Sequence, residues 1–232
     1  MPLGERLLGF ATVLLISVIL AGLTWKHLYR LCYFFPSYLF AVALGDFLML
    51  TWPKRFYQWE FWQAKETLYA LLKFGIALEL AALTLQAFPG ARARARLWAL
   101  GMLSLTLLVL ALNPAPGEDL ADLAVELQPR LANGTALLFA VVWGAVIWYH
   151  IPLHRLHRAI LRGFVPFLLT FTVLYRLLTT VGWDVHQAVN YGTGAAYVLM
   201  LLYWTWEVWR HEPISDVDPQ LLRRLQPWRD RL

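Results

Sequence analysis

Long hydrophobic stretches alternate with short polar ones along almost the whole of this 232-residue chain. Seven stretches approach or exceed the length that crosses a hydrocarbon core of about 30 Å, which takes roughly 20 helical residues. They lie at 7–25, 32–52, 67–88, 97–113, 131–151, 163–182 and 188–209. None shows the regular polar alternation of a membrane-barrel strand. The pattern therefore predicts an all-α polytopic membrane protein with seven transmembrane helices.

Composition supports this prediction and narrows the function classes. The chain is 59% hydrophobic and 15% charged, and its mean hydropathy of +0.53 is too high for an ordinary soluble domain. The single cysteine, Cys32, excludes an internal disulfide and a cysteine-based metal cage. The segments outside the predicted spans form no soluble basic domain that could hold a duplex, so the net charge of +5 does not indicate nucleic-acid binding. The expected partner is the lipid bilayer.

Basic residues are unevenly distributed between the two sets of loops. Thirteen of the 20 lysines and arginines follow odd-numbered predicted helices, and the remaining loops are richer in acids. The positive-inside rule then predicts an outside N-terminus and a cytoplasmic C-terminus. The first apolar run is as long as a full span, which favours a retained helix over a cleaved signal. We expect the protein in a bacterial cytoplasmic (inner) membrane.

Three short motifs occur twice in the same order, which predicts an internal duplication. The pairs are Trp25-Lys26-His27 with Trp148-Tyr149-His150, Phe34-Phe35-Pro36 with Phe164-Val165-Pro166, and Trp59-Glu60 then Gln63-Ala64 with Trp183-Asp184 then Gln187-Ala188. Four regions follow: a three-helix repeat (1–90), a linker helix with an outer amphipathic segment (91–129), a second three-helix repeat (130–210) and a cytoplasmic amphipathic tail (211–232). Both repeats enter the membrane in the same direction, and the working surface is expected between them. The tail favours an anchoring role over a regulatory one.

Charged residues inside predicted spans are the main candidates for function. Each costs about 2.5–3.5 kcal/mol at a helix centre on insertion scales, so each needs a partner or a purpose. They are Asp46, Lys73, Glu79 and Arg176. Asp46 lies ten residues after Pro36 and Arg176 ten residues after Pro166. The duplication therefore predicts an ion pair between Asp46 and Arg176, with Lys73 at a similar depth.

Two interpretations of this charge layer stay open. In the first, it lines an outward-facing cavity of net positive charge for an anionic or zwitterionic small molecule, with walls from Tyr69, Tyr191 and Tyr197. In the second, Asp46 and Arg176 form a buried structural pair, while Lys73 reaches the outer headgroups or Glu66. Glu79 lies deeper and has no obvious basic partner. A neutral structural carboxyl is favoured there over a proton path.

Three histidines share the spacing that aligns side chains on one helix face. His150, His154 and His157 stand at i, i+4 and i+7, which can ligate a metal. Neighbouring Pro152 and the arginines beside the histidines favour a stripe that binds lipid headgroups instead. No phosphate loop, nucleophile elbow or zinc-protease motif is present, and the last span has no lysine for a retinal Schiff base. The sequence predicts no cofactor and favours a protein that is not an enzyme.

Two resemblances accompany these features. The layout of three helices, a linker and three helices resembles the SWEET sugar facilitators and the PQ-loop proteins, and Pro36, Pro152 and Pro166 are similar to their hinge prolines. The first helix lacks a matching proline, and the Pro-Gln signature is absent. Leu28-Tyr29-Arg30 running into Phe35-Pro36, with Glu66 and Glu79, resembles a set of uncharacterised bacterial seven-helix membrane proteins, which implies no function.

Two function classes therefore stay open. The first is a small-solute transporter or sensor with a polar pocket between the repeats, which predicts a water-accessible cavity. The second is a non-catalytic accessory subunit of a larger membrane complex, which predicts a dry core and membrane-protein partners. The excess positive charge of the inferred layer favours the first.

Overall fold

The structure, a computed structural model, describes residues 3–86, 120–148, 150–151, 153–182 and 185–210. Within these ranges the regular structure is entirely helical. The long helices are α1 (Leu3–Trp25), α2 (Phe34–Thr51), α4 (Trp59–Gln86), α6 (Leu120–Trp148), α7 (Arg155–Val181) and α8 (His186–Trp209). A 3₁₀ turn, η1 (Leu28–Arg30), precedes α2, and a short helix, α3 (Pro53–Phe56), precedes α4. The predicted span at 97–113 and the tail at 211–232 lie outside the described residues.

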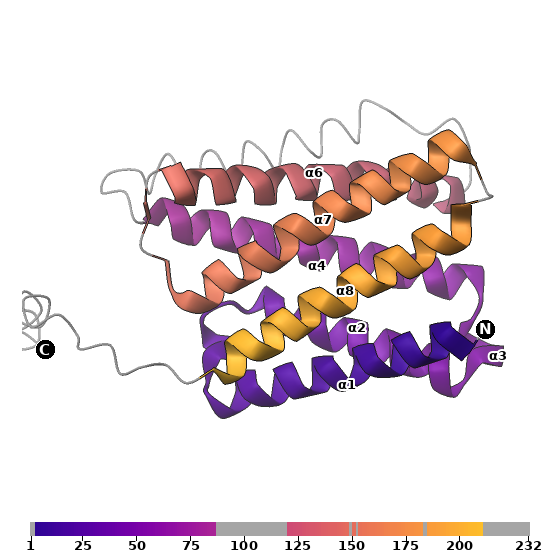
Figure 1. Cartoon of the computed structure of the whole chain (residues 1–232), viewed down its shortest axis with the longest axis horizontal. Coiled ribbons are helices and arrows are strands. Elements are labelled where there is room, and N and C mark those ends of the chain that lie inside the picture. The colour runs from indigo at the N-terminus through magenta and orange to yellow at the C-terminus, as the bar shows by residue number, and fades with distance from the viewer. Residues whose placement is uncertain (1–2, 87–119, 149, 152, 183–184, 211–232) are drawn as a thin grey trace, which may run out of the picture.

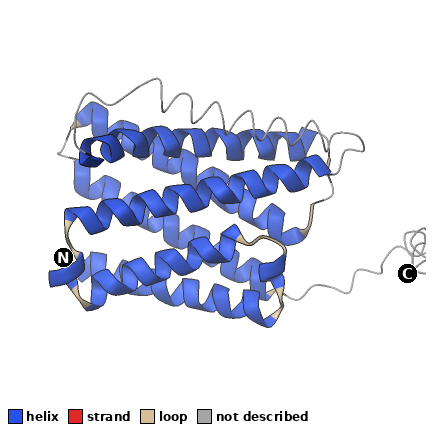
Figure 2. Ribbon diagram, turned by 180° about the vertical axis from the view of Figure 1, so that it is seen from behind, coloured by secondary structure: helices blue, strands red, loops and turns tan. Residues whose placement is uncertain are grey.

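The long helices pack side by side in a closed ring. Helix α1 contacts α2 and α8, α2 contacts α4, α4 contacts α6, α6 contacts α7, and α7 contacts α8. Figures 1 and 2 show this arrangement from opposite sides, with α1, α4, α6 and α8 running in one direction and α2 and α7 in the other. Since each helix has two neighbours, the inward faces of all six contribute to one core.

Large aromatic side chains occupy the centre of the ring. The Phe164 ring centroid lies 4.9 Å from that of Phe139 and 4.8 Å from that of Trp204. Phe35 packs edge-on against Trp204 at 4.9 Å. The indole of Trp204 donates a hydrogen bond to the backbone oxygen of Ala159 at 3.0 Å, which satisfies its buried N–H. These contacts join α2, α6, α7 and α8.

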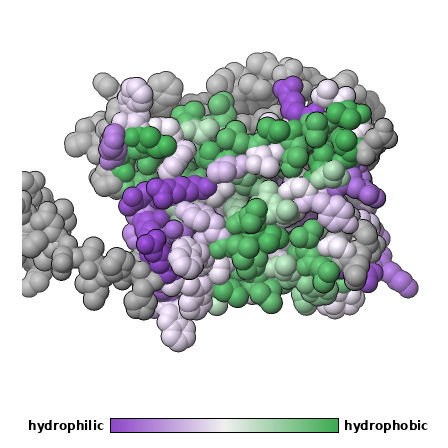
Figure 3. Space-filling model, in the orientation of Figure 1, coloured by the Kyte–Doolittle hydropathy of each residue, from purple (hydrophilic) through white to green (hydrophobic). Residues whose placement is uncertain are grey.

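Large apolar side chains make up much of the outer surface of the bundle. Four helical segments are long and apolar enough to cross a membrane: Arg6–Trp25, Phe34–Thr51, Trp59–Thr84 and Arg155–Leu178. Figure 3 shows hydrophobic residues across much of the middle of one face and hydrophilic residues toward its ends. Within the described ranges, the prediction of an all-helical structure with segments long and apolar enough to cross a membrane is confirmed. The count of seven spans stays a prediction. The internal repeat and the orientation in the membrane stay predictions.

Helix boundaries differ from the predicted ones at three places. Helix α4 begins at Trp59 rather than near 67, and α7 begins at Arg155 rather than near 163. Residues 120–128, predicted as part of a separate surface helix, are instead the start of α6, which runs unbroken from Leu120 to Trp148. Hydropathy detects only the apolar part of a helix, so polar first turns are missed. The early starts of α4 and α7 place charged residues inside these helices.

Candidate functional site

A charged cluster lies where α2 packs against α4. The Lys65 Nζ lies 3.4 Å from Asp46 Oδ1 and 3.5 Å from Glu66 Oε1. The side chain of Lys65 is only 10% exposed, whereas those of Asp46 and Glu66 are about one quarter exposed. Since one ammonium group lies between two carboxylates, its charge is compensated within the protein.

A chain of three tyrosines, each from a different helix, runs from this cluster into the bundle. The Tyr69 hydroxyl approaches the backbone oxygens of Ala41 and Val42 at 3.2 and 3.3 Å and donates to them. The hydroxyls of Tyr38 on α2 and Tyr197 on α8 lie 3.3 Å apart. The Tyr38 and Tyr69 rings pack edge to face at 6.2 Å, which links the hydroxyl pair to the α4 side of the cluster. Of the predicted wall residues, Tyr69 therefore contacts the cluster, and Tyr197 is linked to it through Tyr38.

Gly45 permits this close packing. A Cβ atom at Gly45 would collide with the Tyr69 hydroxyl and would lie 2.9 Å from Lys65 Cδ. Glycine at this point of α2 lets two side chains of α4 cross the helix surface directly beside Asp46.

Lys73 lies two turns beyond Glu66 on α4. It is partly exposed and interacts electrostatically with Glu66. Among the described residues it makes neither a salt bridge nor a hydrogen bond. Counting Lys65 and Lys73 against Asp46 and Glu66, the cluster is balanced in charge, not net positive as the sequence suggested. Lys65 and Glu66 were not predicted as site residues. Had the third helix been predicted to begin before residue 67, the i, i+4 spacing of Lys65 and Tyr69 would have placed both on the same helix face.

Arg176 does not pair with Asp46, whose ion-pair partner is Lys65. Arg176 lies on an exposed part of α7. Helices α2 and α7 are not adjacent in the ring, since α1 and α8 lie between them on one side and α4 and α6 on the other. The predicted pairing of Asp46 with Arg176, which rested on their equivalent positions in the two repeats, is therefore not formed. Tyr191 also lies apart, near the start of α8, where its ring is the nearest side chain to Gly4.

Glu79 receives hydrogen bonds at the start of α2. Its Oε1 accepts from the Tyr33 N–H at 3.0 Å, and its Oε2 accepts from the Phe34 N–H at 3.1 Å and from the Cys32 thiol at 3.0 Å. A carboxylate at a helix N-terminus accepts hydrogen bonds from the free N–H groups and interacts favourably with the helix dipole. Burial and the contact with Glu79 raise the pKa of Cys32 above the ordinary thiol value, which keeps this donor protonated. Glu79 is thus hydrogen-bonded to another helix. The neutral form of this carboxyl, which the sequence favoured, stays a prediction.

The three histidines do not share one helix face. Helix α6 ends at Trp148, His150 has a positive φ of 49°, and α7 begins only at Arg155. The His154 ring caps α7 by accepting from the Leu156 N–H at 3.2 Å. The buried His157 ring bonds to the Leu31 backbone oxygen at 3.0 Å, which ties α7 to the turn before α2. The i, i+4, i+7 interpretation was wrong because His150 and His154 lie in the connection between α6 and α7, and only His157 lies within a helix.

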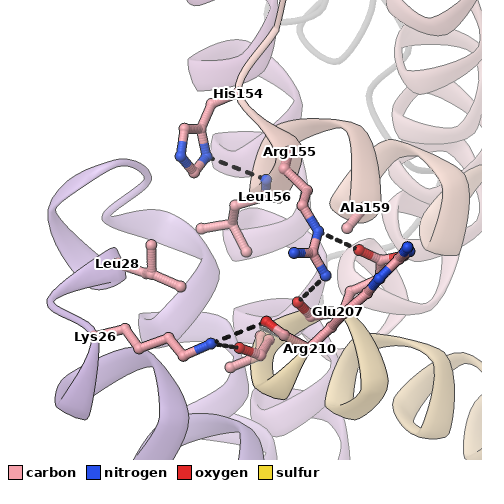
Figure 4. Close-up of a pocket in the computed structure, with 9 residues that line it drawn as sticks. Lys26, Leu28, His154, Arg155, Leu156, Ala159, Glu207 and Arg210 are labelled. Carbon is pink, nitrogen blue, oxygen red and sulfur yellow. Dashed lines mark hydrogen bonds and ion pairs between the residues drawn. The ribbon is translucent and has the colours of Figure 1, made fainter. Parts of the chain in front are cut away.

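Basic residues meet the end of α8 near this interruption (Figure 4). Lys26 Nζ donates to the backbone oxygens of Val208 and Arg210 at 2.7 and 3.2 Å. Arg155 donates to the Glu207 carboxylate at 2.8 Å and to the Glu207 backbone oxygen at 2.9 Å. These bonds satisfy carbonyls that the last helical turn leaves free. They also fix the start of α7 and the end of α1 against α8.

No protein-family model, curated protein or solved structure matches this chain. The described residues form a helical bundle with four segments long and apolar enough to cross a membrane, a charge-balanced cluster between α2 and α4, and basic residues that meet the end of α8.

Proposed function

We propose that this protein is a small-solute transporter or sensor, and that its solute binds at the cluster of Asp46, Lys65, Glu66 and Lys73. The observation that carries the proposal is a partly exposed set of two cations and two anions within helices apolar enough to span a membrane. Charges in such segments are expensive and commonly mark solute or ion paths.

The balance of charge favours a zwitterionic solute. Lys65 is already held by two carboxylates, whereas Lys73 lacks a salt bridge among the described residues. A solute carboxylate could bind Lys73, while a solute ammonium could share Asp46 or Glu66 with Lys65. The hydroxyls of Tyr38 and Tyr197 would supply neutral hydrogen-bonding groups nearby.

The test is a thermal-shift screen of the purified protein in lipid nanodiscs against zwitterionic and anionic solutes. A solute that raises the melting temperature of the wild type should fail to do so for Asp46→Asn and Lys73→Gln, because a ligand stabilises only the form that binds it. Lys54→Gln, in the exposed short helix α3, is the matched control and should retain the shift. Equal shifts in all variants would refute binding at the cluster.

The accessory-subunit function has its own supporting observation. Asp46 and Glu79 are both engaged within the chain, as expected for charges with a structural role. Purification in mild detergent followed by native mass measurement separates the two functions. Stoichiometric membrane-protein partners would support the accessory subunit, whereas a lone monomer or homo-oligomer would support the transporter or sensor.

A further inference from the structure

A second polar site lies at the end of the bundle where α7 begins and α8 ends. A pocket of about 210 Å³ is lined by Arg155, Arg158, Arg162, Arg210, Tyr203 and Glu207. Four arginines thus face one carboxylate. In Figure 3 a hydrophilic strip runs inward from the end of the molecule that carries these residues.

The charge of Glu207 is already compensated by Arg155. The Arg155 Nε lies 2.8 Å from the Glu207 carboxylate, and a second guanidinium nitrogen donates to the Glu207 backbone oxygen. The carbonyls of Val208 and Arg210 are bonded to Lys26. The negative end of α8 is therefore neutralised by cations that do not need a further partner.

The charges of the other three arginines are not compensated by a salt bridge with a described residue. Arg158, Arg162 and Arg210 are exposed, and none forms a salt bridge with a described residue. Arg158 and Arg162 are four residues apart on α7, a spacing at which like charges repel. The positive dipole at the start of α7 adds to the same potential. Arg162 also lies over the Trp143 ring, with its guanidinium carbon 5.7 Å from the ring centroid, which helps to hold it in place.

From this geometry we infer that the pocket binds a phosphate group. Guanidinium groups match phosphate oxygens with paired hydrogen bonds, which suits three arginines around one small space. The volume of about 210 Å³ is smaller than that of sites for drug-sized ligands, about 300–1,000 Å³. It fits a compact phosphomonoester or phosphodiester, which a lipid headgroup or a soluble phosphate compound could supply. This site is separate from the Asp46 cluster and does not depend on the solute proposed there.

The experiment compares two double variants in the full-length protein. Arg158→Gln with Arg162→Gln removes two cations from the pocket. Lys54→Gln with Arg55→Gln removes two exposed cations from α3 and leaves the pocket intact. Melting temperature and monodispersity in detergent establish that each variant is folded. Binding is measured with nanodiscs containing phosphatidylglycerol or phosphatidylcholine alone, with native mass measurement of retained lipid, and by titration with inorganic phosphate and pyrophosphate.

We expect the pocket variant to bind the phosphate group at least tenfold more weakly, and the α3 variant to bind as the wild type does. Loss of retained phosphatidylglycerol would identify a lipid source, whereas loss of phosphate or pyrophosphate binding would identify a soluble one. An equal loss in both double variants would show nonspecific charge attraction and overturn the inference. So would unchanged binding of all probes in a folded pocket variant.

Discussion

Replacing Glu79 tests the tertiary contact that fixes the start of α2. Glu79→Ala removes one carboxylate that accepts from two backbone N–H groups and from the Cys32 thiol. Loss of a helix N-terminal cap costs about 1 kcal/mol, and loss of a further hydrogen bond costs about 1 kcal/mol. We therefore expect a destabilisation of about 2 kcal/mol, which corresponds to about 4–8 °C in melting temperature for a chain of this size.

Two further variants make the result specific. Glu79→Gln retains one acceptor oxygen, so we expect about half the loss, near 1 kcal/mol. Glu60→Ala, at an exposed position in the first turn of the same helix, should change the melting temperature by no more than about 2 °C. The assay is thermal unfolding in one detergent at one protein concentration. A Glu79→Ala protein as stable as Glu60→Ala would refute the reasoning.

The remaining predictions concern three other residues of the bundle. Because burial raises the pKa of Cys32, its maleimide labelling should stay far slower than that of an unfolded chain near neutral pH. Its contribution to stability should be complete below the ordinary thiol pKa of 9.0 and should fall as pH rises above that value, which unfolding measured across pH would show. Gly163→Ala should destabilise the protein by about 1–3 kcal/mol, because the new methyl group would collide with the Trp204 indole and break the hydrogen bond from that indole to Ala159. Tryptophan fluorescence and the melting temperature would measure this effect. Lys26→Gln should cost about 0.5–1 kcal/mol in thermal unfolding by weakening the cap at the end of α8, and a stability equal to wild type would contradict that cap.

The sequence predicted the class of the fold because hydropathy measures the length and apolar character of each segment, and these properties decide whether it can form a membrane-spanning helix. The apolar runs at 7–25 and 32–52 match α1 and α2 within a few residues. Polar first turns were less visible. Lys65 and Glu66 were left outside the predicted third helix, and the partner of Asp46 was therefore missed.

Side-chain pairing could not be predicted from repeat geometry. The duplication suggested Arg176 as the partner of Asp46, but their helices are not neighbours in the ring. Nor could the sequence show that Glu79 reaches the start of α2, because that contact joins residues more than forty positions apart. Helix periodicity likewise aligned His150 with His154, although α6 ends at Trp148, before His150, and α7 begins only at Arg155.

Water access to Lys73 tests the proposed solute site most directly. In a Cys32→Ser background, Lys73→Cys would be reacted with a membrane-impermeant thiol reagent in reconstituted vesicles. The controls are Glu60→Cys at an exposed position and Ile76→Cys at a position with 0% exposure. The account predicts labelling of Lys73→Cys much faster than of Ile76→Cys, approaching that of Glu60→Cys. Labelling as slow as that of Ile76→Cys would mean that the cluster is sealed, and would contradict a solute site there.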